Sequence, residues 1–258
     1  MGDILREAEG LLQSGVKEIM LLGQNVNSYG NGADETFPRL LKALDDMGVP
    51  RIRFMTSHPK DLSDALIDVM ANGRHICNHL HLPVQSGNDE ILRRMNRRYT
   101  REKYLERVSA LRAAMPAIGL TTDLIVGFPG ETEAQFADTL SLVGEVGYDS
   151  AFTFIYSPRE GTRAATMPDQ IAPEVASERI ERLIREVEAS TARAHASMLG
   201  TTESVLIEGV SKRDAQQVQG KGTRGITITL DGTPEDVGHI LPVRVTDTAV
   251  NTLRGERA

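Results

Sequence analysis

The chain has 258 residues, 40% of them hydrophobic and 25% charged, which is typical of a globular protein with room for one large and one small domain. Its single cysteine excludes a disulfide framework and any metal or cluster site built mainly from thiolates within this chain. The net charge of −7 argues mildly against a dedicated nucleic-acid binder. It is compatible with a local basic patch, because charges more than about 10 Å apart are largely screened.

The amino-terminal residues carry charge from the start. Residues 1–7 read MGDILRE and lack the apolar core of a signal peptide. No apolar run in the sequence approaches the roughly 20 residues of a membrane span. We therefore expect a cytoplasmic protein.

Helical and strand patterns alternate over the first two thirds of the chain. Apolar spacing and turn residues predict helices over 3–14, 38–47, 61–72, 88–95, 101–115 and 132–146. Short apolar runs predict strands over 17–22, 51–55, 76–82, 120–126 and 151–156. This alternation indicates right-handed βαβ units and a parallel sheet, with too few strands for a closed eight-stranded barrel. The predicted fold class is α/β, an open or partial parallel (β/α) barrel with its chemistry at the carboxyl ends of the strands.

The pattern changes in the last third. Residues 172–199 are rich in Ala, Glu, Arg and Leu and predict one long helix. Short strands are expected over 204–208, 215–219, 225–230 and 240–246, a spacing typical of a small antiparallel barrel or sandwich. The sequence thus predicts a partial α/β barrel over 1–171, a connecting helix over 172–199 and a small antiparallel β-barrel over 200–258.

Polar residues, glycines and prolines follow each predicted strand of the first part. These segments read GQNVN (23–27), TSHP (56–59), LPVQSG (82–87), GFPGE (127–131) and YSPREGT (156–162). Their amides, hydroxyls and carboxylates could hydrogen-bond the amino acid, ribose and base of a nucleotide-like cofactor in a cleft. For any single segment, ordinary turn chemistry is the simpler explanation.

Histidines and the cysteine are the obvious candidates for metal ligands in this part. His79 and His81 point to the same face of one strand, but no third ligand stands near them in the sequence. We therefore predict no metal site. Cys77 is expected to be a small buried hydrophobe, and Thr132 with Gln135 is expected to cap a helix.

Cations stand in two predicted turns of the small domain, SKRD (211–214) and GKGTRG (220–225). Lysines and arginines in barrel loops commonly contact RNA phosphates, although a solvated hairpin explains the same residues equally well. Residues 200–258 contain no aromatic residue, so base stacking is not expected. Any contact with RNA would be to its sugar–phosphate backbone and would not read the base sequence.

Several long motifs together resemble one known family, the MiaB-type radical-SAM tRNA methylthiotransferases. They read LGQNVNSYG (22–30), HLPVQSG (81–87), MNRRY (95–99), TDLIVGFPGE (122–131) and YSPREGT (156–162). The tail resembles a TRAM domain, an RNA-binding barrel, through VLIEGVSKRD (205–214) and NTLRGE (251–256). The resemblance spans nearly the whole chain.

The resemblance implies methylthiolation of C2 of an N6-isopentenyl-type adenosine beside the tRNA anticodon. It implies S-adenosylmethionine and 4Fe–4S clusters as cofactors in the complete family member, and the tRNA anticodon stem–loop as partner. The positions that match the family's cofactor-facing strand ends are Gln24, Asn25, Ser57, Gln85, Asp123, Gly127, Glu131 and Tyr156. The expected RNA contacts are Ser211, Lys212, Arg213, Lys221, Arg224 and Arg254.

The chain departs from the family pattern in two places. Glu160 stands where a proline is expected, and the motif Cys-x-x-x-Cys-x-x-Cys that binds the radical-generating cluster is missing. We therefore expect this chain to lack cluster binding by itself and to require the amino-terminal part of the same enzyme as a partner. The alternatives are a non-catalytic tRNA-binding module and a different parallel α/β enzyme with a nucleotide cofactor. In-frame coding sequence upstream of Met1 with three closely spaced cysteines would favour the enzyme fragment, and a stop codon there would favour the tRNA-binding module.

Overall fold

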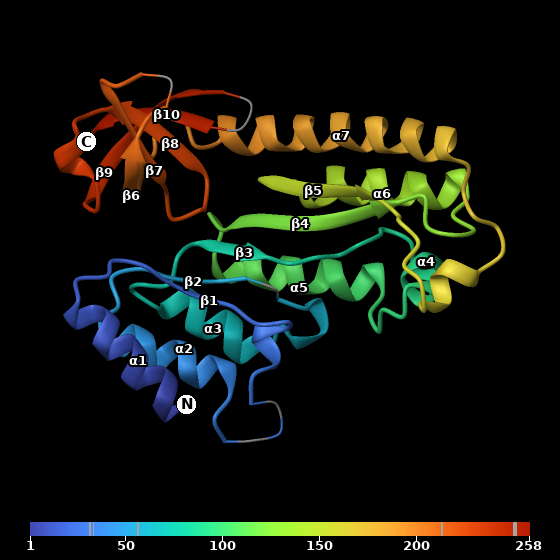
Figure 1. Cartoon of the computed structure of the whole chain (residues 1–258), viewed down its shortest axis with the longest axis horizontal. Helices are drawn as coiled ribbons and strands as arrows, with labels where there is room; N and C mark the ends of the chain where they lie inside the picture. The colour runs from blue at the N-terminus through green and yellow to red at the C-terminus, as the bar shows by residue number, and fades with distance from the viewer. Residues whose placement is uncertain (31, 33, 56, 213, 250–251) are drawn as a thin grey trace.

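The computed structural model describes all residues except 31, 33, 56, 213, 250 and 251. Five parallel strands make up the first part: β1 (Ile19–Leu21), β2 (Ile52–Phe54), β3 (His79–His81), β4 (Gly119–Val126) and β5 (Ser150–Ile155). β1 pairs with β2, β3 to β5 form a second sheet, and a parallel bridge between Ile52 and Ile76 links the two (Figure 1). The strands follow chain order without closing, which confirms the predicted partial parallel barrel.

Helices cover the outer face of these strands. They are α1 (Gly2–Gln13), α2 (Phe37–Asp46), α3 (Asp64–Asn72), α4 (Asp89–Arg94), α5 (Arg101–Ala114) and α6 (Glu133–Val146), with short 3-10 turns at Val26–Ser28, Pro59–Asp61 and Arg163–Thr166. Thr132 and Gln135 form the predicted capping box of α6. One hydrophobic core lies between the strands and helices and includes Phe37, Leu66, Leu80 and Tyr104. The inner face stays open, since Phe152 and Phe154 of β5 are 54% and 51% exposed.

A long helix, α7 (Pro173–Ala196), runs along β5 and α6 and connects the two parts of the molecule (Figure 1). Leu183 and Val187 are buried on its inner side. Ser190 Oγ donates a hydrogen bond to the Tyr148 carbonyl at 2.9 Å. Among the described residues, no helix combines the length and the apolar character needed to cross a membrane.

The last part is a closed five-stranded barrel. Its strands are β6 (Thr202–Val210), β7 (Gln217–Lys221), β8 (Thr227–Asp231), β9 (Ile240–Thr248) and β10 (Thr252–Arg257), with a 3-10 turn at Pro234–Asp236. They pair in the order β10-β8-β7-β6-β9. The predicted small antiparallel β-barrel is confirmed, but the sequence prediction had four strands and missed β10. β10 was missed because Leu253 is its single apolar residue, and it closes the barrel by pairing parallel with β8.

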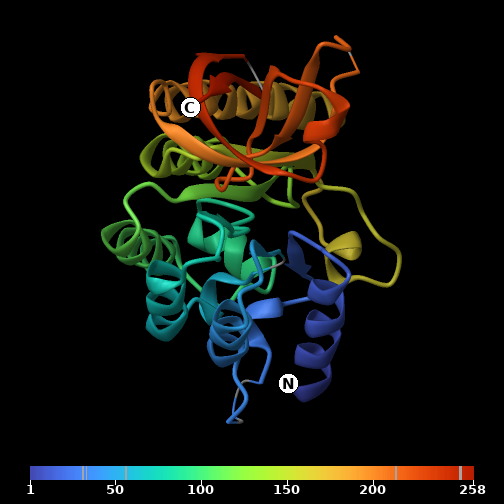
Figure 2. The ribbon, with the colours of Figure 1, turned by 90° about the vertical axis from the view of Figure 1, so that its left-hand side faces the viewer.

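Two buried arginines join the barrel to the amino ends of the strands. Arg51 and Arg53 of the β2 segment each donate through Nε to Glu18 Oε2 at 2.9 Å. Their remaining N–H groups donate to four barrel carbonyls, those of Ser204, Lys221, Gly222 and Thr223. Figure 2 looks onto this end, with the barrel in front of α7.

Replacement of Glu18 by Gln should therefore destabilise the whole molecule. Arg51 and Arg53 are each 4% exposed, so the substitution leaves two buried guanidinium groups without their shared negative charge. We expect a loss of about 3 kcal/mol or more in the free energy of unfolding, measured by urea titration. Asp46→Asn is the control, because it breaks an exposed pair with Lys42 and should change stability by less than about 1 kcal/mol. Equal effects would contradict the structural role of Glu18.

His79, at this junction, makes the stability of the folded protein depend on pH. Its ring lies beside Gly225 of the barrel, and its Nε2 is 3.1 Å from Thr121 Oγ1. Burial, together with the charge of Arg53, lowers the pKa of His79 from 6.5 to about 3.

The folded protein thus excludes a proton that the unfolded chain binds. The stability due to His79 is complete above pH 6.5 and falls below it by up to about 1.4 kcal/mol per pH unit. In His79→Gln, the urea midpoint should fall less than in the parent between about pH 7 and pH 5. Parallel curves for the two proteins would contradict a neutral buried imidazole.

Candidate functional site

Three of the predicted cofactor residues meet at the carboxyl ends of the strands. Gln85, Asp123 and Tyr156 line a cleft of about 460 Å³. The Gln85 amide donates to the Asp123 carbonyl, and the Ile125 amide donates to the Gln85 carbonyl, both at 2.9 Å. Gln85 has a φ of 71° and is 8% exposed. A left-handed backbone at a buried non-glycine residue is strained, a feature that clusters at functional sites.

Several buried oxygen atoms at this edge have no hydrogen-bond partner among the described residues. They are Tyr156 Oη, Ser57 Oγ and Asn25 Oδ1. A buried polar atom without a partner costs about 1–3 kcal/mol. The ring of Tyr156 is held by an edge-to-face contact with Phe128, with centroids 5.0 Å apart. This edge therefore offers fixed hydrogen-bonding groups that the protein itself leaves unused.

Asp123 faces a histidine across the inner surface of the sheet. His81 Nε2 lies 3.5 Å from Asp123 Oδ1, and His81 Nδ1 lies 3.0 Å from Thr121 Oγ1. His79 shares Thr121, so the two histidines lie on one face, as predicted. Among the described residues, no three His, Cys, Asp or Glu side chains gather as a metal site would need. Cys77 is 3% exposed, which confirms it as a buried residue.

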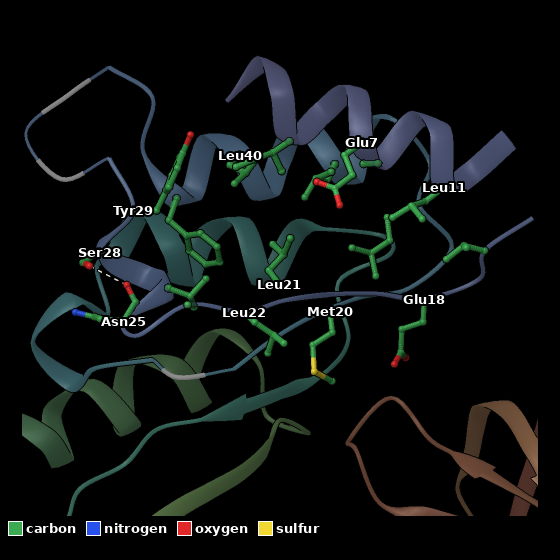
Figure 3. A pocket seen from close by; sticks show the side chains of 18 residues that line it. Glu7, Leu11, Glu18, Met20, Leu21, Leu22, Asn25, Ser28, Tyr29 and Leu40 are labelled. Atoms are coloured by element: carbon green, nitrogen blue, oxygen red, sulfur yellow. Dashed lines mark hydrogen bonds between the residues drawn. The ribbon is translucent and has the colours of Figure 1, made fainter. Parts of the chain in front are cut away.

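Asn25 lies at the end of β1, beside an apolar pocket between α1 and β1. The pocket has a volume of about 670 Å³, and the side chains around it are shown in Figure 3. Asn25 Nδ2 donates to Asp61 Oδ2 at 2.7 Å, and its carbonyl accepts from Ser28 Oγ at 2.8 Å (Figure 3). Gln24 is exposed at the same turn.

Gly127 and Glu131 hold a loop rather than line the 460 Å³ cleft. The Gly127 amide donates to Glu131 Oε2 at 2.8 Å, and Arg179 Nη1 of α7 donates to the same oxygen at 3.0 Å. Burial raises the pKa of the Glu131 carboxyl, and the Gly127 amide and Arg179 oppose this. The predicted cofactor contacts of these two residues stay a prediction.

Asn27 was missed as a positioning residue, although it stands within the GQNVN motif. Its Nδ2 donates to the His58 carbonyl at 3.1 Å, and its Oδ1 accepts from the His58 amide at 2.9 Å. The two bonds join the segments that follow β1 and β2. Burial, with the charge of Arg97, lowers the pKa of His58.

Some of the residues predicted to contact RNA are exposed, and others interact with residues of the protein itself. Lys212 and Arg254 are exposed. Arg224 is 12% exposed and forms an ion pair with Asp149, which lies just before β5. Lys221 is half-buried, Ser211 donates its amide to the Gln217 carbonyl, and Arg213 lies outside the described residues. Their RNA contacts stay predictions, and for Arg224 the structure adds a role at the junction of the two parts.

Comparison with known families identifies both parts of the chain. A model of the Radical SAM superfamily matches residues 1–143, and a model of the TRAM domain matches residues 196–257. The chain belongs to the Radical SAM superfamily and carries a TRAM domain at its carboxyl end.

Two curated relatives carry the name of a tRNA-methylthiolating enzyme, in agreement with the resemblance seen in the motifs. A protein of Lachnoclostridium phytofermentans named tRNA-2-methylthio-N(6)-dimethylallyladenosine synthase is 50% identical over 248 residues, covering 95% of this chain and 54% of the relative. A protein of the same name from a Thermoanaerobacter species is 49% identical, covering 98% and 55%. The chain thus spans about half the length of these relatives.

The fold also matches a solved radical-SAM enzyme. Coproporphyrinogen III oxidase from Escherichia coli superposes with a TM-score of 0.55 at 18% identity, covering 81% of this chain and 55% of that protein. At this identity the likeness supports the fold alone.

Loss of the unused hydroxyl groups should leave the fold intact. Tyr156→Phe and Ser57→Ala break no hydrogen bond to a described residue, so the free energy of unfolding should stay the same or rise by up to about 1 kcal/mol. Tyr104→Phe is the matched control. Its hydroxyl donates to the Leu82 carbonyl at 3.0 Å and accepts from Tyr148 at 2.8 Å, so its loss should cost about 1–2 kcal/mol. Equal destabilisation in urea titrations would show that Tyr156 serves the fold.

Proposed function

We propose that this chain supplies the S-adenosylmethionine cleft and the RNA-binding barrel of a tRNA methylthiotransferase. The observation that carries the proposal is the 50% identity over 95% of the chain to a tRNA-2-methylthio-N(6)-dimethylallyladenosine synthase. In support, three residues of the motifs that carry the resemblance, Gln85, Asp123 and Tyr156, line one cleft. The proposed substrate is an N6-isopentenyl-type adenosine beside the tRNA anticodon, modified at C2.

The residues at this edge fit the cofactor. The unpartnered Tyr156 hydroxyl and Ser57 Oγ, with Gln85 and Asp123, would hold the amino-acid, ribose and adenine groups of S-adenosylmethionine. Bound beside the cluster of the longer protein, which would supply the electron that cleaves it, S-adenosylmethionine would provide the radical chemistry that an unactivated aromatic C–H bond requires.

The chain's own side chains would orient the cofactor and limit water. Asp123 offers a carboxylate held opposite His81 at 3.5 Å, suited to a cationic amine or a ribose hydroxyl. Phe154 and Ile155 give the cleft an apolar wall. The sequence has one cysteine, so under this proposal the longer protein supplies the cluster ligands.

The TRAM barrel would hold the tRNA by its phosphates. Lys212 and Arg254 are exposed on it, and Lys221 is half-buried. The barrel carries no aromatic residue, so its contacts would contribute affinity without reading the sequence.

A chimera tests this function directly. Residues 1–258 would replace the matching region of the Lachnoclostridium phytofermentans relative, in a bacterial strain that lacks its own enzyme. We expect the methylthiolated adenosine in hydrolysed tRNA, detected by mass spectrometry. In the chimera, Gln85→Ala and Tyr156→Phe should lower the product roughly tenfold, the effect of one lost hydrogen bond.

Two controls complete the experiment. Arg185→Gln, on the exposed side of α7, should keep the product level of the parent chimera. The 258-residue chain alone should give no product, because it has one cysteine. A folded chimera that binds tRNA and leaves it unmodified would contradict the proposal.

A further inference from the structure

A second pocket lies beside the cofactor cleft and is rich in arginine. It has a volume of about 990 Å³ and shares Ile125, Tyr156, Thr162 and Ala164 with the cleft. Four arginines line it, and Glu90 is the one acidic residue among its described lining. We name it the arginine pocket, after Arg93, Arg94, Arg97 and Arg163. The whole chain has a net charge of −7, so its composition does not explain why positive charge gathers in this pocket.

Two of these arginines lack a counterion among the described residues. Arg93 donates to Glu90 at 2.9 Å, and the same carboxylate interacts with the charge of Arg94. The side chains of Arg97 and Arg163 form no hydrogen bond or ion pair with any described residue. Arginines buried elsewhere in the molecule are neutralised, as Arg51 and Arg53 are by Glu18. The unpaired guanidinium groups are therefore available to an anion.

Two of these arginines have restricted positions beside α4. Asn96, two residues past the end of α4, has a φ of 59°, and the Arg97 amide donates to the Leu92 carbonyl at 2.8 Å, which fixes the backbone at Arg97. Arg97 is half-buried and its Nε has no partner. The guanidinium group of Arg94 lies against Gly130, where a side chain would collide with it. Such pre-positioned guanidinium groups lose little freedom when they bind an anion.

We infer that the arginine pocket binds a phosphodiester of the RNA next to the nucleotide that enters the cleft. This inference rests on the proposed function, since it takes RNA as the substrate. Guanidinium groups match the geometry of phosphate oxygens and bind them in pairs. The TRAM barrel packs at the opposite, amino ends of the strands, so its cations lie far from the cleft (Figure 1). A nucleotide extruded into the cleft needs its own backbone contact there.

RNA binding by Arg163→Gln, Arg97→Gln and the double variant tests this inference. The probe is a fluorescein-labelled anticodon stem–loop RNA, and affinity is measured by anisotropy at several KCl concentrations. The double variant should bind at least roughly tenfold more weakly at low salt. Its plot of log affinity against log salt should be shallower by about 0.7 for each lost phosphate contact. Arg163 is exposed, so Arg163→Gln keeps the test open even if Arg97→Gln folds poorly.

The controls separate this inference from the proposed function. Arg185→Gln removes an exposed arginine of α7 and should behave as the parent. Lys212→Ala with Lys221→Ala tests the TRAM barrel. If these barrel variants weaken binding while the arginine variants keep the parent affinity or slope, the inference is overturned and the RNA role stands. If the parent chain itself does not bind the RNA, both are overturned.

Discussion

Buried guanidinium groups require a nearby negative charge, and this requirement organises the molecule. Glu18 neutralises both Arg51 and Arg53, and the remaining N–H groups of these arginines are satisfied by carbonyls of the closed barrel. The strand ends on this side are therefore closed by protein. Arg224 with Asp149 adds a second buried pair at the same junction. The sheet has one free end, and all the candidate chemistry lies there.

The two ends of the sheet differ in how fully their polar groups are satisfied. At the junction, Arg51 and Arg53 have partners at ordinary hydrogen-bond distances, while the buried Arg224 Nε has none among the described residues. At the carboxyl ends, Tyr156, Ser57 and Arg97 each keep a buried polar atom without a partner in the described part of the chain, and Gln85 has a strained backbone. Each such feature lowers stability, so the fold must be stabilised elsewhere, and the hydrophobic core does this.

The sequence was sufficient for the order and type of the elements in the first part, because each helix has an apolar stripe and most have a side-chain cap. It was insufficient for β10, whose polar residues become a strand only through barrel closure. Motifs led to Gln85, Asp123 and Tyr156, since residues after parallel strands gather at one edge. The ion pairs were not predicted. Glu18 and Arg53 are 35 residues apart, and Asp149 and Arg224 are 75 apart, so their pairing depends on the assembled fold.

Under the proposed function, the position of the TRAM barrel at the amino ends of the strands sets a length scale for the RNA. β4 has 8 residues and runs from the junction toward the cleft, a span of roughly 26 Å at about 3.3 Å per residue. An RNA that touches the barrel and also reaches the cleft must bridge at least that distance. Arg51 and Arg53 hold the barrel against the strands and keep this span constant. Under the proposed function, the molecule would therefore select RNA by the separation between its phosphate-binding stem and its reactive base, a property that a short oligonucleotide lacks.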